Sequence, residues 1–162
     1  MEIRSVKSSD YDVISPIIDE WWGGRPMADK LPKLFFVHFT TTSFIAELDG
    51  KMVGFLIGFL SPSHADEGYI HFVGVHPDYR KHHVGRDLYH RFYAVMRENG
   101  RKIVRAVTSP VNKGSIAYHT KMGFEIEKGN KEVDGISVFA DYDGPNQDRV
   151  LFVKTLQEEY GA

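Results

Sequence analysis

Residues 79 to 92, "YRKHHVGRDLYHRF", combine a basic cluster with the start of an apolar helical stripe. The basic cluster occupies positions 80 to 83, and Val84, Leu88 and Phe92 follow at the spacing of one helix face. The N-terminus of a helix has backbone N–H groups without partners and a partial positive charge. Beside basic side chains, such amides could bind a phosphate. A solvated basic surface next to an ordinary helix start is the alternative interpretation.

Gly85 lies in the first turn of this helix, which the apolar spacing predicts over residues 84 to 98. A side chain at position 85 would stand between the helix amides and a bound phosphate. The glycine therefore favours the phosphate-binding interpretation.

Another glycine, Gly74, interrupts the apolar segment "GYIHFVGVHP", which predicts a half-buried strand. Glycine inside a strand often marks a bulge or the close approach of another backbone. A strand that bends away from its neighbour leaves N–H and C=O groups unpaired, and these can pair with an amide-bearing ligand. By alternation, Tyr69, His71, Val73 and Val75 share one face of this strand.

A third segment, "NKGSIAYHTKMGF", predicts a helix over residues 113 to 122. Asn112 can cap the N-terminus of this helix, and Gly123 supplies the left-handed residue that commonly ends one. Ser115, Tyr118 and His119 lie on the helix.

These segments alternate with other predicted strands and helices. Before them we expect a strand at "EIRSV" and a helix through "DYDVISPIIDEWW" that is capped by Ser8 or Ser9. A second helix is expected from Met27 to about Phe39. The strands "SFIAEL" and "KMVGFLIGFL" follow and are joined by the hairpin signal "DG". Later strands are "RKIVRAV", "FEIEK" and "RVLFVKTL", with an irregular stretch containing "ISVFADYDGPNQD" before the last. This order predicts an α/β domain with a mixed sheet.

The composition narrows the classes of function. The 162 residues are 42% hydrophobic and 26% charged, as in a globular domain, and the net charge of −2 argues against nucleic-acid binding. The absence of cysteine excludes thiolate ligands, and the histidine spacing fits no metal-ligand pattern, so we expect no metal. Without a leader-like N-terminus or a long apolar run, we expect a cytoplasmic protein that does not contact membranes.

Taken together, the three segments resemble the GNAT superfamily of N-acetyltransferases, and the resemblance covers most of the chain. The family pattern is a strand ending in V-x-P, then R/Q-x-x-G-x-G/A at the start of a helix, and later N-x-x-[AS] followed by an aromatic pair and G-F. The matching residues are "VHP" at 75 to 77, "RKHHVG" at 80 to 85, and Asn112, Ser115, Tyr118, His119, Gly123 and Phe124.

The resemblance implies a single domain over residues 1–162, with a mixed, mostly antiparallel sheet, flanking helices and a splayed fourth strand. It also implies direct transfer of an acetyl group from acetyl-CoA to a primary amine of a small molecule or peptide. The helix loop would hold the pyrophosphate of acetyl-CoA, and the fourth strand its pantetheine arm. The expected binding residues are Val73, Gly74, Val75, Arg80, Lys81, His82, His83, Val84, Gly85, Arg86, Asn112 and Ser115.

Two positions depart from the family pattern. His83 stands where the first glycine usually is, so the loop needs a histidine at positive φ, which costs roughly 1 to 2 kcal/mol. His119 stands where the family often has the tyrosine that protonates the departing thiolate. The role transfers by position to His119. Tyr118 is its rival, because a one-residue twist of the helix would exchange the two side chains.

The reaction also needs a group that accepts the proton of the amine, because an alkylammonium with a pKa of about 10.4 is almost fully protonated at pH 7. The candidates on the fourth strand are Glu67, Tyr69 and His71. In the alternative interpretation, His71 is a histidine of the sheet whose hydrogen-bonding needs are met within the protein, and Glu67 is a solvated charge at the end of the strand.

The acceptor region is expected near "WWGGRP". One of its two tryptophans should enter the core, and Trp22, with Arg25 and Tyr69, is our candidate wall for an acceptor that carries an apolar or anionic group. The nearby segment "FFVHF" is expected to bury two of its three phenylalanines.

Acidic residues could also attract a cationic amine. Three of them, Asp141, Asp143 and Asp148, lie in one glycine-containing turn, although such turns are more often merely solvated.

A non-catalytic acyl-CoA-binding sensor or interaction module is the alternative function. A proton donor at His119 and a base near Glu67 favour the enzyme, because acid–base catalysis needs such groups. The expected partner is an amine substrate, without nucleic acid or membrane. A homodimer is allowed if an exposed strand near the C-terminus pairs across a two-fold axis.

Overall fold

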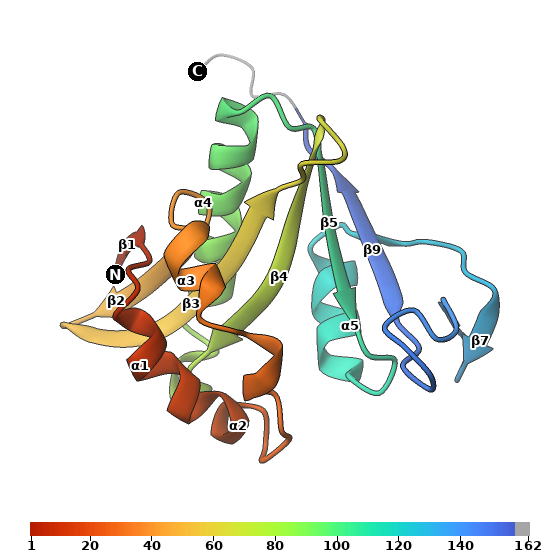
Figure 1. The fold of residues 1–162 in the computed structure, drawn as a ribbon, viewed down its shortest axis with the longest axis horizontal. Coiled ribbons are helices and arrows are strands. Elements are labelled where there is room, and N and C mark those ends of the chain that lie inside the picture. The colour runs from red at the N-terminus through yellow and green to blue at the C-terminus, as the bar shows by residue number, and fades with distance from the viewer. Residues whose placement is uncertain (158–162) are drawn as a thin grey trace. The chain divides into compact units, whose positions relative to one another are not determined.

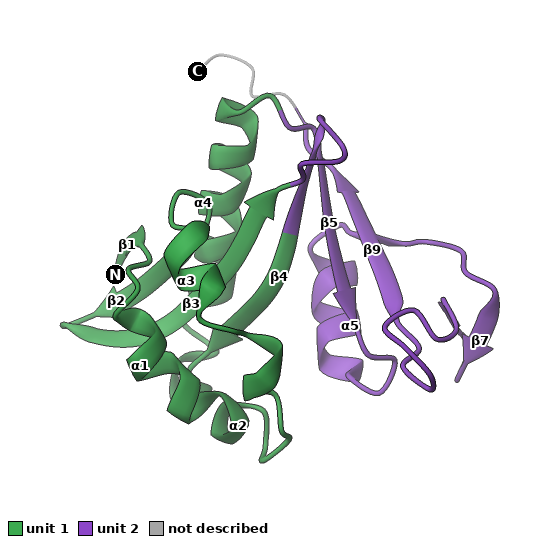
Figure 2. Cartoon of the chain, in the orientation of Figure 1, with its two compact units in different colours: residues 1–60, 70–100 green, residues 61–69, 101–162 purple. Residues whose placement is uncertain are grey.

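The structure is a computed structural model that describes residues 1–157. The chain divides into two compact units (Figure 2). Unit 1 consists of residues 1–60 and 70–100, and unit 2 of residues 61–69 and the chain from residue 101 onward. We describe each unit by itself.

Unit 1 contains the N-terminal helices, four strands and the longest helix (Figure 1). Its elements are β1 (Glu2–Ser5), α1 (Asp10–Ile14), α2 (Ile18–Trp21), α3 (Leu34–His38), β2 (Phe44–Leu48), β3 (Lys51–Leu60), most of β4 (Glu67–Val75) and α4 (Val84–Glu98), with 3-10 turns at Ser15–Ile17, Ala28–Lys30 and Pro77–Tyr79.

Unit 2 contains the first residues of β4 and the C-terminal elements. These are β5 (Ile103–Thr108), α5 (Lys113–Lys121), β6 (Glu125–Ile126), β7 (Lys131–Val133), β8 (Ile136–Val138) and β9 (Val150–Thr155). The strand order of the main sheet is β1-β2-β3-β4-β5-β9-β6, and β7 and β8 form a separate hairpin. Strands β1, β2 and β3 pair antiparallel in unit 1, as β5, β9 and β6 do in unit 2. The predicted α/β fold with a mostly antiparallel sheet is confirmed.

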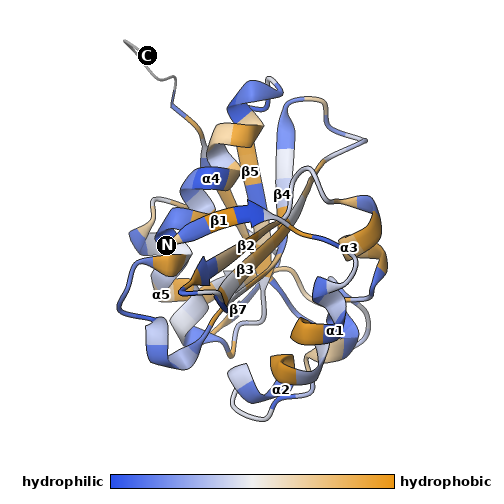
Figure 3. Cartoon of the chain, turned by 90° about the vertical axis from the view of Figure 1, so that its left-hand side faces the viewer, coloured by the Kyte–Doolittle hydropathy of each residue, from blue (hydrophilic) through white to orange (hydrophobic). Residues whose placement is uncertain are grey.

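The sheet of unit 1 is covered by helices on both faces. Ile45 and Phe55 belong to a core cluster that also contains Ile14 of α1, Trp21 of α2 and Phe36 of α3. Alternation sends the intervening residues to the other face, where Gly54 lies against side chains of α4. Figure 3 shows the resulting apolar character of β2 and β3.

The predicted helices of the first forty residues are shorter than expected. The helix through "DYDVISPIIDEWW" is divided into α1 and α2 by a 3-10 turn at Ser15–Ile17, because Pro16 lacks the N–H that a continuous helix needs. Ser9 is the N-cap residue of α1 but makes no capping hydrogen bond. Instead, the Asp10 carboxylate accepts from the Lys7 amide at 2.7 Å. Only Phe36 of "FFVHF" is fully buried, so the expectation of two was wrong.

Several local predictions are confirmed. Asp49 and Gly50 both have positive φ, as the tight hairpin between β2 and β3 requires. Helix α4 covers the predicted residues 84 to 98. In contrast, the stretch around "ISVFADYDG" was predicted to be irregular but contains β8, the second strand of the hairpin with β7.

The C-terminal strand β9 lies inside the sheet. It pairs with β5 along its whole length, and Phe152 and Val153 also face Ile126 and Glu125 of β6. Pairing with β6 occupies part of the edge through which a homodimer was allowed to form. Within the part of the chain that the structure describes, no helix has the length and apolar character needed to cross a bilayer.

Candidate functional site

The loop into α4 has the backbone conformation that the family pattern requires. His83, the N-cap residue of α4, has φ 58° and ψ 24°, which is the left-handed region. The predicted positive φ at this histidine is confirmed. A left-handed residue before a helix start turns successive amides toward one side of the chain, and such arrangements bind anions.

Most amides of this loop lack acceptors. The His82 amide donates to the Tyr79 carbonyl at 3.0 Å, and the Asp87 amide donates to the His83 carbonyl at 3.0 Å. In contrast, the N–H groups of residue 81 and of residues 83 to 86 have no acceptor among residues 1–157. The loop is therefore a cluster of unpaired donors.

The basic side chains around these amides differ in their contacts. Lys81, His82 and His83 are exposed. Arg80 donates to the Trp21 carbonyl at 3.2 Å, so part of its guanidinium fixes the loop to the end of α2. Arg86 lies 3.3 Å from the Asp87 carboxylate. Lys81 therefore offers a positive charge that no ion pair engages among residues 1–157, and the two exposed imidazoles offer hydrogen-bonding groups.

Gly74 is required by packing inside unit 1. A Cβ at this position would lie 2.7 Å from the Phe55 ring and 2.9 Å from the Trp22 ring. The close neighbours are therefore aromatic side chains of the same unit, whereas we had expected a bulge or another molecule's backbone. Val73 and Val75, on the opposite face, are half-buried.

The two adjacent tryptophans differ in burial, as expected. Trp21 is buried, and Trp22 is half-buried against Phe72, with ring centroids 4.8 Å apart. The following Gly23–Gly24 pair, at φ 68° and 88°, turns the chain sharply. Arg25 follows this turn and is half-buried, and its guanidinium makes no hydrogen bond or ion pair among residues 1–157.

His71 is held by unit 1. Its Nε2 lies 2.6 Å from the Lys30 carbonyl oxygen, and its ring stacks on Phe35 at 4.2 Å with an angle of 5°. A carbonyl oxygen only accepts, so Nε2 carries a proton and is already engaged. This geometry agrees with the interpretation of His71 as a histidine of the sheet whose hydrogen-bonding needs are met within the protein.

Helix α5 positions His119 in the interior of unit 2. The Asn112 side chain accepts from the Ser115 amide at 3.1 Å, which confirms the predicted cap. His119 is 8% exposed and stacks on Phe152 of β9, whereas Tyr118 is 36% exposed. Burial lowers the pKa of His119, and its hydrogen bond with the Ser115 carbonyl opposes this shift only in part.

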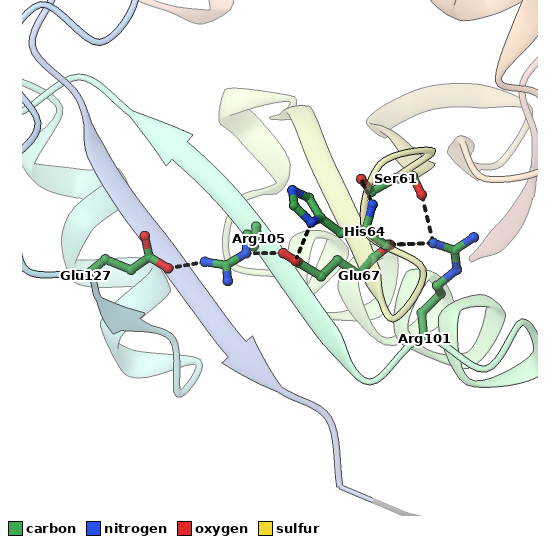
Figure 4. A network of polar contacts seen from close by, with 6 residues as sticks. All are labelled: Ser61, His64, Glu67, Arg101, Arg105 and Glu127. Carbon is green, nitrogen blue, oxygen red and sulfur yellow. Dashed lines mark hydrogen bonds and ion pairs between the residues drawn. The ribbon is translucent and has the colours of Figure 1, made fainter.

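Glu67 lies in a polar network at the start of β4 (Figure 4). The residue is only 8% exposed, so its interpretation as a solvated strand-end charge was wrong. Its carboxylate pairs with Arg105 of β5, which also pairs with Glu127. His64 lies 3.8 Å from the same carboxylate. The Glu67 carboxylate is therefore already engaged by an arginine of unit 2.

A second arginine holds the backbone beside this network. Arg101 donates from Nη1 to the carbonyls of Ser61, His64 and Glu67 at 2.9, 2.9 and 3.1 Å. The loop before β4 is therefore fastened to the start of β5 within unit 2.

Tyr69 keeps its phenolic proton. Burial raises its pKa above its ordinary value, and the nearby Tyr142 and Asp143 raise it further. Tyr69 is therefore a hydrogen-bond donor at neutral pH, which disfavours it as the base.

The acidic turn is ordered by contacts within unit 2. Asp148 pairs with Lys131 at 2.8 Å, and Asp143 pairs with Arg149 at 2.7 Å. Asp141 accepts from the Asn146 amide at 2.7 Å. Among the residues described, no three histidine, cysteine, aspartate or glutamate side chains are placed to hold a metal ion.

The candidate residues thus fall into two groups. Unit 1 contains the CoA-loop candidates, the 73–75 segment, His71, Trp22 and Arg25, and unit 2 contains Glu67, Tyr69, Asn112, Ser115, Tyr118 and His119. The predicted splay of β4 concerns the boundary between the units and stays a prediction. Sequence reasoning missed Arg101, Arg105 and Phe152, which hold the candidates of unit 2 in place.

Known proteins resemble this chain in sequence. An uncharacterized N-acetyltransferase of Methanocaldococcus jannaschii is 33% identical over 86 residues, which are 51% of this chain and 38% of that protein. The L-2,4-diaminobutyric acid acetyltransferase of Nocardia farcinica is 34% identical over 79 residues, which are 49% of this chain and 41% of that protein. The chain therefore matches about two fifths of the length of these relatives.

Solved structures resemble the chain over nearly its whole length. Ard1 from Thermoplasma volcanium has a TM-score of 0.75 at 18% identity, covering 97% of this chain and 98% of that one. An aminoglycoside 6'-N-acetyltransferase complexed with coenzyme A has a TM-score of 0.71 at 13% identity, covering 98% and 99%. These likenesses show a common fold. The model of the Acetyltransferase (GNAT) family matches residues 10–124, more than half of the chain, and the chain belongs to that family.

Proposed function

We propose that residues 1–162 act as one acetyl-CoA-dependent N-acetyltransferase domain, which transfers an acetyl group directly to a primary amine of a small molecule or peptide. The observation that carries this proposal is the cluster of unpaired amides behind the left-handed His83. Family membership supports acyl transfer. The coenzyme A complex of a fold neighbour supports the choice of ligand.

The amide cluster fits the pyrophosphate of acetyl-CoA. Phosphate oxygens accept hydrogen bonds from such amides, and the N-terminal end of α4 favours negative charge. The exposed Lys81 adds local positive charge to a chain whose net charge is −2, and the exposed imidazoles of His82 and His83 add hydrogen-bonding groups. We assign the pantetheine arm to residues 73 to 75, and Asn112 and Ser115 remain candidates for contacts from unit 2.

The proposed chemistry needs few protein groups. The amine nitrogen attacks the thioester carbonyl carbon, a C–N bond forms and the nitrogen gives up one proton. The C–S bond breaks with its electron pair on sulfur, and the departing thiolate takes a proton. We assign this last proton transfer to His119, because it is the inward-facing side chain at the family's acid position. Holding the two reactants in line supplies much of the acceleration.

The acceptor is assigned only by class. Trp22, Arg25 and Tyr69 are our candidates for contacting it. The guanidinium of Arg25, which has no partner within the described residues, suits an acceptor with an anionic group. Relatives and fold neighbours are named for acceptors as different as diaminobutyric acid and aminoglycosides. We therefore assign the acceptor only to the class of primary amines. The cytoplasmic location and the homodimer stay predictions from the sequence.

Release of free thiol from acetyl-CoA, measured with a panel of amines, tests the proposal. The panel should include diamines, amino acids, aminoglycosides and peptides with a free α-amino group or lysine. Amine-dependent thiol release supports the enzyme. Stabilisation of the protein by coenzyme A, without release for any amine, would favour the alternative of a non-catalytic acyl-CoA sensor.

A further inference from the structure

Arg25 lies on a segment of unit 1 whose backbone is fixed by hydrogen bonds. The Asp19 carboxylate accepts from the backbone amides of Met27 and Ala28 at 2.8 and 2.9 Å. The Arg25 amide donates to the Trp22 carbonyl at 3.3 Å, and the Met27 amide donates to the Arg25 carbonyl at 2.9 Å. The backbone is therefore held on both sides of Arg25, which fixes the point from which its side chain extends.

The side chain of Arg25 has no partner within the described part of the chain. The residue is half-buried, yet its guanidinium makes no hydrogen bond or ion pair among residues 1–157. Two other half-buried arginines are paired with carboxylates, Arg4 with Asp10 and Arg105 with Glu67. A cation that is partly removed from water is stabilised by an anion that accepts its hydrogen bonds.

The carboxylates of the same segment do not serve as this anion. Asp19 uses Oδ1 to accept from two backbone amides, and Glu20 and Asp29 are exposed. Within residues 1–157, none of these three carboxylates forms an ion pair with Arg25. With respect to the described residues, the guanidinium is therefore available to an anion of a ligand.

Trp22 supplies an apolar surface on the same segment. Its ring packs on Phe72 with centroids 4.8 Å apart, and a Cβ at Gly74 would lie 2.9 Å from it, so the ring is fixed against β4. Trp22 is only half-buried. All of these residues and Arg25 belong to unit 1, so a cation and an accessible aromatic surface occur together within one unit.

We propose that Arg25 binds a carboxylate of the acceptor, so that the substrate class is a primary amine that also carries a carboxylate. The apolar part of such a molecule would lie against Trp22. This inference rests on the proposed function and narrows its acceptor from primary amines in general. Arg25 is then the residue that determines specificity for the anionic group.

The chemistry of the guanidinium favours a carboxylate. Its planar pair of N–H donors matches the two oxygens of a carboxylate, and the resulting hydrogen bonds are charge-assisted. Exposed Glu20 and Asp29 on the same segment disfavour a ligand with a larger negative charge. An acceptor that carries only positive charges would be repelled by Arg25 without gaining a hydrogen bond from it.

Pairs of acceptors that differ only in the carboxylate test the proposal. Lysine, ornithine, β-alanine and glycylglycine are each compared with their carboxamides in the thiol-release assay. In the wild type we expect kcat/KM for at least one carboxylate to exceed that for its carboxamide by about tenfold or more, mainly through KM, because hydrogen bonds between charged groups contribute that much. Thiol release with other amines, but with none of these carboxylates, would overturn the inference and leave the proposed function standing.

Substitution assigns this preference to Arg25. Arg25→Gln keeps hydrogen-bonding groups but removes the charge, and the carboxylate-to-carboxamide ratio of kcat/KM should fall about tenfold. The intrinsic reactivities of the two amines cancel, because both proteins receive the same pair. Arg25→Lys, which keeps the charge without the planar fork, should give an intermediate ratio.

Arg91→Gln is the matched control, because it makes the same change on an exposed residue of α4 in the same unit. Its ratio should stay within about twofold of the wild type. A ratio that is unchanged in Arg25→Gln, or that falls equally in Arg91→Gln, would overturn the proposal.

NMR of the arginine side chains gives a readout that does not depend on turnover. The Nε–H signal of Arg25, assigned by its loss in Arg25→Gln, should shift when lysine is added in the presence of coenzyme A and stay in place when lysinamide is added. If no amine releases thiol, the proposed function fails, and this shift would still support a carboxylate site at Arg25. Equal responses to lysine and lysinamide would overturn the carboxylate site whether or not thiol is released.

Discussion

Phe152 of β9 lies face to face with His119 of α5, with ring centroids 4.5 Å apart and ring planes at 14°. The contact settles which side of α5 faces the sheet of unit 2. Tyr118, the next residue toward the N-terminus, is the more exposed of the two candidates. His119 is therefore the inward-facing residue of the two, and its role as the acid stays a prediction.

A pair of substitutions tests this assignment. If His119 protonates the leaving thiolate, His119→Ala should lower kcat by about a hundredfold or more with little change in CoA affinity, because a placed proton donor typically contributes that much. Tyr118→Phe should have a much smaller effect, since it removes only a hydroxyl from an exposed ring. Steady-state kinetics and calorimetry with coenzyme A measure the two quantities. The reverse ranking would move the role to Tyr118.

The amides at the start of α4 give a second prediction. Gly85→Glu places a carboxylate in the first turn of α4, where it would repel a phosphate. We expect CoA affinity to fall at least tenfold, or about 1.4 kcal/mol, in calorimetry. His90→Glu is the matched control, because it puts the same carboxylate on an exposed position in the middle of the same helix. Equal affinity of the two folded variants would remove the phosphate-binding interpretation.

Local signals were sufficient to predict much of the fold. The dipeptide Asp49–Gly50 favours the turn in which it lies, and Asn112 caps the helix that begins at the next residue. Both features depend only on residues that are close in the sequence. The helix over residues 84 to 98 was predictable because one apolar stripe runs through it. Pro16 was visible in the sequence too, and its missing N–H explains why the first helix is divided there.

The candidate site was less predictable because its contacts join distant residues. Nothing in the sequence around Glu67 indicates that Arg105 will neutralise it, since the two residues meet only through pairing of distant strands. The stacking of His119 on Phe152 is equally non-local. Gly74 illustrates a different limit, because a glycine required for packing against Phe55 looks the same in sequence as one that makes room for a ligand.

The Glu67–Arg105 pair should contribute to stability. Arg105→Met leaves the buried Glu67 carboxylate without its guanidinium, and we expect a loss of about 2 kcal/mol in urea unfolding, less than for a fully buried pair because Arg105 is partly exposed. Glu67→Gln in the Arg105→Met background should recover part of this loss. Additive effects of the two substitutions would show that the pair is not coupled.

Asp10 gives a prediction for the pH dependence of stability in unit 1. Burial alone would raise the pKa of its carboxyl, but hydrogen bonds from Arg4 and from the Lys7 amide lower it below its ordinary value. A carboxyl whose folded pKa is lowered binds its proton more weakly in the folded state than in the unfolded state. Its contribution to stability is therefore complete above the unfolded pKa of about 3.9 and is lost as pH falls through the lower folded pKa.

Replacing this carboxylate should remove that part of the pH dependence. We expect Asp10→Asn to cost about 2 kcal/mol at pH 7, because it weakens the bidentate contact with Arg4 at 2.9 Å, and to cost progressively less as the pH falls below about 4. Asp12→Asn is the matched control, since Asp12 is an exposed aspartate in the same first turn. Urea unfolding of the three proteins between pH 3 and 7 measures the difference. A cost for Asp10→Asn that stays constant over this range would show that its effect does not come from the charged pair.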